Sequence, residues 1–505
     1  MNLASPIPTV ERTASAVQVD PQDNVAVALR PLHAGEDVEV AGRQLRIGDP
    51  IELGHKFALS DISPGQMIRK YGSLIGRSTA PIAAGGHTHT HNVETLLSGV
   101  EAYRYAPQAA AALPSAPDAH FSGYRRPDGR VGTRSEIWIL PTVGCVSRTA
   151  ERIAAISRTR HAGAVDGVYA FTHPFGCSQL GDDLAGTRSV LAALACSPNA
   201  GGVLIIGLGC ESNQLDALLS EIPEGLRGHI RTLRAQAEED ETEAGLAIVD
   251  SLVAAASLAR REPAPLSDLV VGLKCGGSDA FSGLTANPLV GRIADVVVGS
   301  GGSALLSEIP EIFGAERMLM ARAADRTVFD ALVAVVNDFK NYFIEHGQPV
   351  SENPSPGNLA GGITTLEEKS LGAVQKGGHA PVADVLRYGD RVRHQGLSLL
   401  EAPGNDAVSS TALAAAGATV ILFTTGRGTP LGFPVPTIKI ASNSGLAGRK
   451  KNWIDFDAGQ VLDHGLDAAA EKLTALITRI ASGEQTASER NDEREIAIWK
   501  RGVTL

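Results

Sequence analysis

The chain has 505 residues, of which 43% are hydrophobic and 20% are charged, and its net charge at neutral pH is −11. This length predicts roughly two to four domains, and the negative charge argues against a protein that binds nucleic acid. No segment approaches the ~18 consecutive apolar residues of a membrane helix, and the amino terminus lacks the basic start and apolar stretch of a secretory signal. The cysteines are odd in number and widely spaced, which does not suit a disulfide framework, so we expect a cytoplasmic protein that contacts neither membranes nor nucleic acids.

The composition and the hydrophobic pattern of the sequence change several times along the chain. Residues 1–20 are polar and are expected to be flexible, and residues 21–98 carry short strand-like runs without a helical period, which predicts a small all-β domain. Alanine and proline then predominate in a linker over residues 99–122. Beyond it, apolar runs alternate with glycine turns and helical periods. This pattern predicts two α/β catalytic subdomains with largely parallel sheets, over residues 123–262 and 263–505.

Helical periods within these subdomains mark several elements. The predicted helices cover residues 147–157, 243–261, 316–346 (as one helix or in two pieces), 409–416 and 467–482, and further strands cover residues 295–298 and 419–424. An acidic run that ends at Glu241 precedes the helix at 243–261. We expect this run to form the solvated first turn of that helix, where the helix dipole favours negative charge.

Four of the five cysteines each follow an apolar, β-branched run that predicts a buried strand. The runs cover residues 138–143, 168–172, 203–208 and 269–273, and the cysteines are Cys145, Cys177, Cys210 and Cys275. Ligands gather at the carboxyl ends of strands in open α/β sheets, so we expect a shared metal or redox site, although a single free cysteine is commonly a small buried hydrophobe. Cys177, Cys210 and Cys275 suit an iron–sulfur cluster with one open iron, and a mononuclear iron bound by histidine and carboxylate is the alternative.

Polar residues close to these cysteines are the candidate catalytic groups. The candidates are His173, Glu211, Lys274 and Asp279. We expect His173 or Glu211 to be the general base, because imidazole and carboxylate groups move protons near neutral pH. Glu308 and Glu311 lie three residues apart and would share a face in a helix, where they could bind a metal or transfer protons; an exposed helix pair is an equally good interpretation.

Three alternating histidines lie in the predicted all-β domain, within residues 85–92 (GGHTHTHN). Alternate side chains of an extended segment share a face about 6–7 Å apart, which suits imidazoles that converge on a divalent cation if the strand bends at its glycines. We therefore expect His87 and His89 to bind a metal or the substrate. The alternatives are an exposed strand end with incidental histidines and the remnant of an expression tag.

Glycine-rich loops farther along the chain carry short hydroxyl and amide side chains, which suit a substrate with several hydroxyl groups. The candidate substrate-binding residues are Ser278, Asn287, Asn358, Arg427 and Lys439. Arg427 can pair with a carboxylate through two hydrogen bonds. The chain has no phosphate-binding GxxxxGK[ST] loop and no convincing dinucleotide motif after a strand, so nucleotides are disfavoured.

Ten motifs in order along the chain carry a family resemblance. They occupy residues 54–59, 70–72, 87–92, 123–126, 173–177, 207–211, 274–279, 353–358, 423–430 and 453–456. In these motifs the chain resembles the altronate/galactarate dehydratase family over nearly its full length. The resemblance implies a small amino-terminal β-clip domain of the SAF type and a large catalytic region. It also implies removal of water from a sugar acid to give a 2-keto-3-deoxy acid, with ferrous iron as cofactor and manganese as the alternative metal.

Within this family, the histidine run and the ending at residues 500–505 resemble the altronate branch, because galactarate enzymes lack that run. Gly86 and Thr88 depart from the branch, which often carries an acidic and an apolar residue at these positions. We expect conversion of D-altronate into 2-keto-3-deoxy-D-gluconate and water, with galactarate dehydration or another hydroxy-acid lyase reaction as the alternative. A sugar-acid-binding or iron-storing protein without turnover and a thiol redox carrier are the other classes, and the sequence leaves open whether the chain forms a homo-oligomer.

The expected mechanism needs distant segments to converge on one iron. The expected metal ligands are His87, His89, Cys177, Cys210 and Cys275. A base abstracts the poorly acidic proton beside the substrate carboxylate, and the metal assists the loss of hydroxide. Arg427 and Lys439 are expected to hold the substrate carboxylate.

Overall fold

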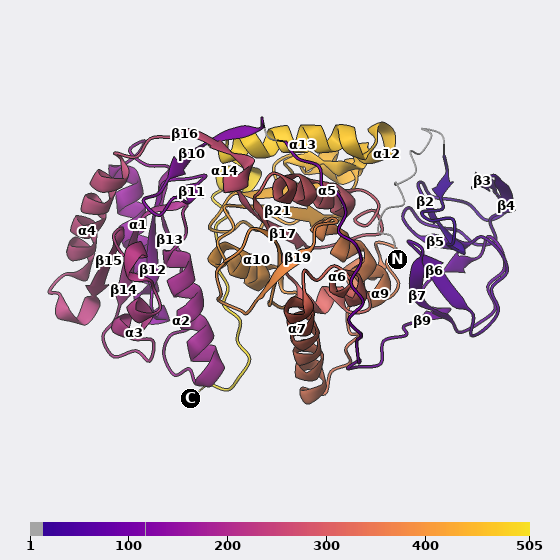
Figure 1. Ribbon diagram of the computed structural model, residues 1–505, viewed down its shortest axis with the longest axis horizontal. Coiled ribbons are helices and arrows are strands. Elements are labelled where there is room, and N and C mark those ends of the chain that lie inside the picture. Colours follow the sequence, from indigo (N-terminus) through magenta and orange to yellow (C-terminus); the bar gives the residue numbers. More distant parts are fainter. Residues whose placement is uncertain (1–13, 117, 505) are drawn as a thin grey trace.

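The computed structural model describes residues 14–116 and 118–504 (Figure 1). An antiparallel all-β region at the amino end is followed by two regions built on parallel sheets, which confirms the predicted fold class. Residues 1–13 of the segment predicted to be flexible lie outside the described residues. None of the described helices is long and apolar enough to cross a membrane.

The amino-terminal β region is made of short antiparallel strands, as its brief alternating runs predict. Its sheets have the strand orders β1-β2-β5-β8 and β6-β7-β9, with a separate hairpin of β3 and β4. The strands are β1 (Ala16–Val17), β2 (Val25–Ala28), β3 (Asp37–Val40), β4 (Arg43–Arg46), β5 (Lys56–Ala58), β6 (Met67–Lys70), β7 (Ser73–Ser78), β8 (His87–Thr88) and β9 (Val93–Glu94). Phe57 of β5 lies opposite His87 of β8, which brings the histidine run beside the strand that follows His55.

A segment without helix or strand follows the β region. It covers the described residues between 97 and 119 and passes across the seven-stranded region (Figure 1). It leads into a small antiparallel sheet in which β10 (His120–Arg125) pairs with β11 (Val131–Gly132) and with β16 (Glu262–Pro265). This small sheet lies where the two α/β regions meet.

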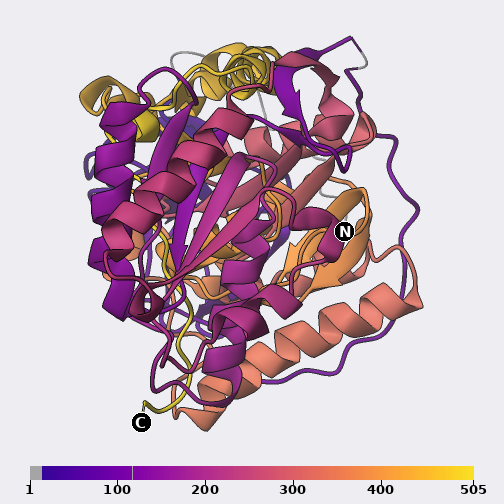
Figure 2. The same ribbon diagram turned by 90° about the vertical axis from the view of Figure 1, so that its left-hand side faces the viewer.

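The first α/β region is a four-stranded parallel sheet with the order β13-β12-β14-β15 (Figure 2). Its elements are β12 (Glu136–Pro141), α1 (Ser147–Arg160), β13 (Gly167–Ala170), α2 (Gly181–Ala195), β14 (Ala200–Gly207), α3 (Leu215–Ser220), β15 (Ile230–Arg234) and α4 (Glu241–Ala256). Ile137 and Ile139 pack with α1 and α4, whereas Trp138 and Leu140 pack with α2 and the second α/β region. Side chains buried on both faces explain why these strands are continuously apolar.

The second α/β region is a seven-stranded parallel sheet with the order β19-β20-β18-β17-β21-β22-β23. Its strands are β17 (Val270–Cys275), β18 (Ser303–Leu306), β19 (Val382–Leu386), β20 (Gly396–Leu400), β21 (Val420–Thr425), β22 (Thr437–Ala441) and β23 (Phe456–Asp457). Its helices are α5 (Ala286–Gly299), α6 (Glu316–Met320), α7 (Arg326–Glu345), α8 (Pro356–Leu359), α9 (Leu366–Ala373), α10 (Asp406–Ala415), α11 (Ser444–Arg449), α12 (Val461–His464), α13 (Leu466–Ala481) and α14 (Ala487–Arg490).

One sequence prediction about these elements is wrong, and two others agree with the structure. The predicted strand at 295–298 is wrong, because these residues belong to α5. The buried residues of α5 recur at helical spacing, so burial of one face overrides the strand preference of its valines. The helical segment predicted at 316–346 forms two pieces, α6 and α7, which is one of the two predicted options. The predicted acidic first turn is present as Asp240, which caps the N-terminus of α4.

A buried ion triad joins the β region to the seven-stranded region. The Glu368 carboxylate of α9 accepts hydrogen bonds from Lys56 Nζ and Lys70 Nζ, each at 2.8 Å, and all three side chains are at most 1% exposed. Burial by itself raises the pKa of Glu368, but the two ammonium groups outweigh it and lower that pKa to about 2. Burial lowers the pKa of Lys56 to about 8, so this docking contact depends on Glu368 remaining charged.

We expect Glu368→Gln to lower the free energy of the first urea-unfolding transition by about 3–5 kcal/mol, because it leaves two ammonium groups buried with a neutral partner. Glu94→Gln is the control, since Glu94 pairs with Arg77 at an exposed site and its loss should cost about 0–1 kcal/mol. The folded pKa of Glu368 lies below its ordinary value of 4.5, so the stabilisation is complete above that pH and is lost as pH falls toward 2. Equal losses in the two variants, or a difference that grows in acid, would contradict this account.

Candidate active site

The carboxyl ends of adjacent strands in the seven-stranded sheet deliver a compact polar cluster. Cys275 is the last residue of β17, Glu308 lies just beyond β18, and Asp406 opens α10 after β20. These strands are neighbours in the sheet, so their ends meet at one edge, where α/β proteins bind ligands. We call this set the lysine–carboxylate cluster. Its members are Lys274, Cys275, Glu308, Glu311, Lys369, Lys376 and Asp406.

Hydrogen bonds connect the members of the lysine–carboxylate cluster into one network. Lys274 Nζ donates to Glu308 and to Asp406 Oδ1, the latter at 2.8 Å. Lys376 Nζ lies 2.8 Å from Cys275 Sγ and 3.4 Å from Glu308 Oε2. Cys275 Sγ also lies 3.3 Å from Glu311 Oε2, and Lys369 Nζ lies 2.9 Å from Glu311 Oε1.

The environment changes the acidity of these groups. Burial raises the pKa of Glu308 even though Lys274 and Lys376 oppose that effect. For Glu311 the neighbouring lysines, with Lys369 the strongest, outweigh burial and lower the pKa to about 2. Burial, reinforced by Glu308, raises the pKa of the Cys275 thiol to about 12, so this thiol is protonated at neutral pH.

Glu308 also has an unusual backbone conformation. Its φ angle is 70°, in the left-handed region that favours glycine. It precedes the 3-10 turn Ile309–Ile312, which carries Glu311. The two glutamates therefore meet through a sharp turn and not through the helical face that their spacing suggested, and a strained non-glycine residue at a buried polar site is typical of functional positions.

Histidines of the β region lie on the other side of the loop that carries α8. His89 Nε2 lies 3.1 Å from the carbonyl oxygen of Leu359. The preceding residue, Asn358, accepts a hydrogen bond from Lys369 Nζ at 3.1 Å and donates one to the carbonyl oxygen of Ser278 at 2.7 Å. The loop thus connects the histidine run to the lysine–carboxylate cluster through direct contacts.

The predicted substrate-binding residues divide into two groups. Arg427 is exposed, its amide donates to the Gly277 carbonyl, and in the described part of the chain its guanidinium has no hydrogen bond or ion pair. Ser278 and Asn358 also lie beside the cluster. Asn287 and Lys439 are instead engaged within the fold. The Asn287 amide binds Gly372 and Thr424, and Lys439 Nζ binds the carbonyl oxygens of Thr429 and Leu431.

Asp279, predicted to be catalytic, is a buried organising residue in the structure. Its carboxylate accepts hydrogen bonds from Ser282 in its own loop, and from Ser442 and Asn443 in the loop that follows β22. Burial raises the pKa of Asp279. Its hydrogen bonds place it as a residue that holds these loops together.

Comparison with known proteins agrees with this architecture. Residues 14–96 match the altronate/galactarate dehydratase SAF domain, residues 123–257 match the D-galactarate dehydratase/altronate hydrolase second domain, and residues 266–504 match the D-galactarate/altronate dehydratase C-terminal domain. The chain belongs to the altronate/galactarate dehydratase family. The β region is therefore its SAF domain, as the resemblance implied.

Full-length relatives are found in both branches of this family. Altronate dehydratase of Escherichia coli (strain K12) is 50% identical, covering 97% of this chain and 99% of that protein. Altronate dehydratase of Bacillus subtilis (strain 168) is 47% identical over 97% of this chain and 100% of that protein. Galactarate dehydratase (L-threo-forming) of Escherichia coli (strain K12) is 33% identical over 94% of each chain.

The dehydratase-family second domain carries the remaining predicted site residues. His173 is buried, its Nε2 lies 2.9 Å from the Pro141 carbonyl, and its Nδ1 accepts a hydrogen bond from the Phe175 amide. Burial lowers the pKa of His173 to about 4, so the ring is neutral with both nitrogens engaged. The Glu211 carboxylate accepts hydrogen bonds from Thr142 Oγ1 and from the amides of residues 208 and 209. Both side chains hold loops in place.

The thiols predicted to converge lie in two different environments. Cys145, Cys177 and Cys210 are exposed, after neighbouring strands of the four-stranded sheet, whereas Cys275 is buried in the other sheet. In the described part of the chain, the hydrogen-bond partners of Cys275 Sγ are Glu308, Glu311 and Lys376. The structure therefore brings Cys275 together with carboxylates and lysines, and not with Cys177 or Cys210.

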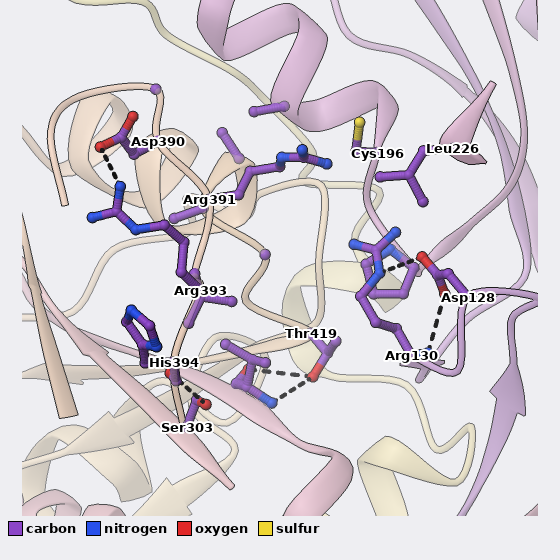
Figure 3. A pocket seen from close by; sticks show the side chains of 18 of the residues that line it. Asp128, Arg130, Cys196, Leu226, Ser303, Asp390, Arg391, Arg393, His394 and Thr419 are labelled. Carbon is purple, nitrogen blue, oxygen red and sulfur yellow. Dashed lines mark hydrogen bonds and ion pairs between the residues drawn. The ribbon is translucent and has the colours of Figure 1, made fainter. Parts of the chain in front are cut away.

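A cavity of about 880 Å³ between the two α/β regions is not this site (Figure 3). Ser303, the first residue of β18, and Thr419, which precedes β21, line it, so it lies at the amino-terminal edge of the seven-stranded sheet. Figure 3 shows Arg391 and Arg393 on one side and Asp128 with Arg130 on the other. The lysine–carboxylate cluster lies at the opposite ends of the same strands.

The sequence analysis missed four members of the site region: His55, Lys369, Lys376 and Asp406. His55 and Lys56 lie within a family motif, at residues 54–59, and that motif was the available signal for His55. Lys369, Lys376 and Asp406 follow no motif or spacing that the sequence analysis used. They reach the site because α9, the turn after it and α10 fold against the end of β17.

We expect iodoacetamide to modify Cys145, Cys177 and Cys210 quickly in the native protein and Cys196 and Cys275 slowly, since only the first three are exposed. Mass spectrometry of digested samples measures each rate, with protein in denaturant as the control in which all five react. Repeating the labelling with ferrous iron tests thiolate ligation, because a metal ligand is protected from alkylation. Unchanged rates at Cys177 and Cys210 would remove these two thiols from any iron site.

Proposed function

We propose that this chain is a hydro-lyase that converts D-altronate into 2-keto-3-deoxy-D-gluconate and water. The observation that carries the proposal is identity of about half the residues with altronate dehydratases along nearly the whole of each chain. The lysine–carboxylate cluster supplies groups suited to this chemistry. Galactarate dehydration is the second candidate, supported by a more distant full-length relative.

The reaction requires removal of a weakly acidic proton from C2, beside the carboxylate. As the C2–H bond breaks, a C2–C3 double bond forms, the C3–O bond breaks, and the resulting enol becomes the 2-keto product. Negative charge develops on the substrate carboxylate during this step, and positioned cations stabilise such charge strongly in a buried site. Lys274, Lys369 and Lys376 provide three ammonium groups at the sheet edge.

Glu308 is the best-supported general base. Burial raises its pKa above the ordinary value of a glutamate, which favours proton transfer, and its carboxylate lies against Lys274, Lys376 and the Cys275 amide. His173 and Glu211 remain predicted alternatives, but their hydrogen bonds to loop atoms favour a supporting role. The Lys369 ammonium is suited to protonate the departing hydroxide, because it is held among the oxygens of Glu311, Asn353 and Asn358.

The exposed Arg427 guanidinium is suited to hold the substrate carboxylate. It is free to form a bidentate pair, and its loop is hydrogen-bonded to Gly277, two residues after Cys275. Asn358 and the Ser278 hydroxyl are suited to contact substrate hydroxyl groups. Asp406, whose side chain is 32% exposed, accepts a hydrogen bond from Lys274 Nζ at the solvent side of the cluster.

Ferrous iron is the metal that the family resemblance implies, with manganese as the alternative. Within the described residues, the ligand atoms of Cys275, Glu308 and Glu311 lie within 4.8 Å of one another and form one donor set. A bound divalent metal would polarise a substrate oxygen and favour loss of hydroxide.

We expect the purified chain, assayed anaerobically with ferrous iron, to release a 2-keto-3-deoxy acid from D-altronate. Galactarate carries a second carboxylate where altronate has a hydroxymethyl group. Binding would remove the hydration of that carboxylate without supplying a matching cation, so we expect kcat/KM for galactarate to be lower by a factor of about 100 or more. Other aldonates in the same assay map the stereochemistry. Turnover of galactarate alone would replace altronate with the second candidate, and no turnover of any sugar acid would reject the proposal.

We expect Glu308→Gln to lower kcat by a factor of about 10²–10⁴, the usual contribution of a general base. It should also abolish exchange of the C2 proton with deuterated solvent, which a merely structural residue would not control. Glu316→Gln is the matched control, since Glu316 is a buried carboxylate paired with Lys340 at 2.8 Å outside the cluster. Normal C2 exchange in a folded Glu308→Gln protein would exclude Glu308 as the base.

A further inference from the structure

The cavity between the two α/β regions is large enough to hold a small molecule (Figure 3). Its volume of about 880 Å³ falls within the roughly 300–1,000 Å³ that is typical of small-molecule sites. One wall is formed by the end of α2 and the turn between β10 and β11, and the other by the loop between β19 and β20 and the end of α10. A ligand in this cavity would therefore contact both regions at once.

Arg391, in the loop between β19 and β20, lines the cavity without a charge partner. In the described part of the chain its guanidinium has no hydrogen bond or ion pair. Figure 3 shows its side chain extending toward Cys196, at the end of α2. Burial raises the pKa of the Cys196 thiol, and Arg391 and then Arg130 oppose that effect, so both guanidinium groups lie near the same wall. A free guanidinium is suited to pair with a carboxylate or phosphate group through two hydrogen bonds.

The acidic side chains that line the cavity are already paired with other arginines. The pairs are Asp128–Arg130 at 2.6 Å, Asp268–Arg125 at 3.1 Å, Asp390–Arg393 at 3.9 Å and Glu221–Arg188 at 3.9 Å. These carboxylates therefore do not neutralise Arg391. Its positive charge remains available to an anionic ligand, which would gain a charge-assisted pair at this wall.

Other polar groups of the lining suit the hydroxyl groups of a ligand. The side chains of Ser267, His394 and Gln395 line the cavity and, among the described residues, form no hydrogen bonds. The carboxyl ends of α2 and α10 also line it, and the carbonyl groups at a helix end carry partial negative charge. Such carbonyls attract hydroxyl groups and repel a second anionic group. The lining therefore fits a hydroxylated molecule with one anionic end.

We infer that this cavity is a second ligand site of the chain, for a small hydroxylated organic anion whose carboxylate or phosphate group pairs with Arg391. The lysine–carboxylate cluster lies at the opposite ends of the same strands, so the two sites are separate. Ligand binding in the cavity is therefore independent of the proposed function. Because the walls belong to different regions, a bound ligand would also stabilise the contact between them.

The test is isothermal titration calorimetry of the full-length chain with two probes: D-gluconate, which carries a carboxylate, and D-glucose 6-phosphate, which carries a phosphate. We expect at least one probe to bind, and the tighter probe identifies the anionic group. Arg391→Gln should weaken this binding by a factor of about 10 or more, because it removes a charge-assisted pair. Arg391→Lys should lose less affinity, since it keeps the charge but not the two-pronged geometry.

Arg387→Gln is the matched control, because Arg387 belongs to the same loop but pairs with Asp338 at 3.1 Å and does not line the cavity. This variant should bind the probe normally. Without a probe, Arg391→Gln should unfold at the same temperature as the unaltered chain, because Arg391 has no ion pair to lose. A clear loss of stability would give Arg391 a structural role and would count against the site.

A sugar acid can also bind at the lysine–carboxylate cluster, and Arg427→Gln separates the two sites. Binding in the cavity should survive in Arg427→Gln. No binding of either probe, or binding that Arg427→Gln abolishes and Arg391→Gln leaves unchanged, would overturn the inference. Failure of the proposed function is seen separately, as absence of sugar-acid turnover in protein that binds a probe through Arg391.

Discussion

The arrangement of this enzyme depends on one buried carboxylate that binds two lysines from a separate domain. Glu368 of α9 fixes Lys56 and Lys70, and Lys56 directly follows His55. On the same helix, Glu367 accepts hydrogen bonds from Thr95 Oγ1 and the Leu96 amide, where the SAF domain ends. One short helix thus positions the histidines and the start of the linker relative to the sheet edge.

The same helix also supplies Lys369 to the lysine–carboxylate cluster. Docking of the SAF domain and assembly of the cluster are therefore structurally coupled through adjacent residues of α9. In the cluster, ammonium and carboxylate groups occur in equal numbers, so each buried charge has a close partner. An unpaired buried charge would shift its pKa or destabilise the fold. Pairing every ammonium group with a carboxylate therefore lowers the free-energy penalty of burying so many charges away from water.

Much of the fold could be predicted from sequence because its signals are local. The apolar, β-branched runs before the cysteines located β12, β13, β14 and β17, and the alternation of the histidine run placed His87 and His89 together. The error at 295–298 arose because β-branched valines prefer strands in isolation, whereas α5 buries one face against the sheet. The site was only partly predictable, since Lys369, Lys376 and Asp406 are brought to Cys275 by tertiary packing that leaves no spacing pattern. The thiols were expected at one shared sheet edge, but Cys145, Cys177 and Cys210 follow strands of the four-stranded sheet, whereas Cys275 ends a strand of the seven-stranded sheet.

Glu308 combines a strained backbone with buried ion pairs to two lysines. Its left-handed backbone costs of order 1–3 kcal/mol for a residue with a side chain, and glycine would adopt it without that penalty. A glycine would leave Lys274 and Lys376 without their shared acceptor. Leaving two buried ammonium groups without that partner costs about 3–5 kcal/mol, more than the backbone strain that glycine would relieve, so the ion pairs themselves hold this residue in its less relaxed conformation.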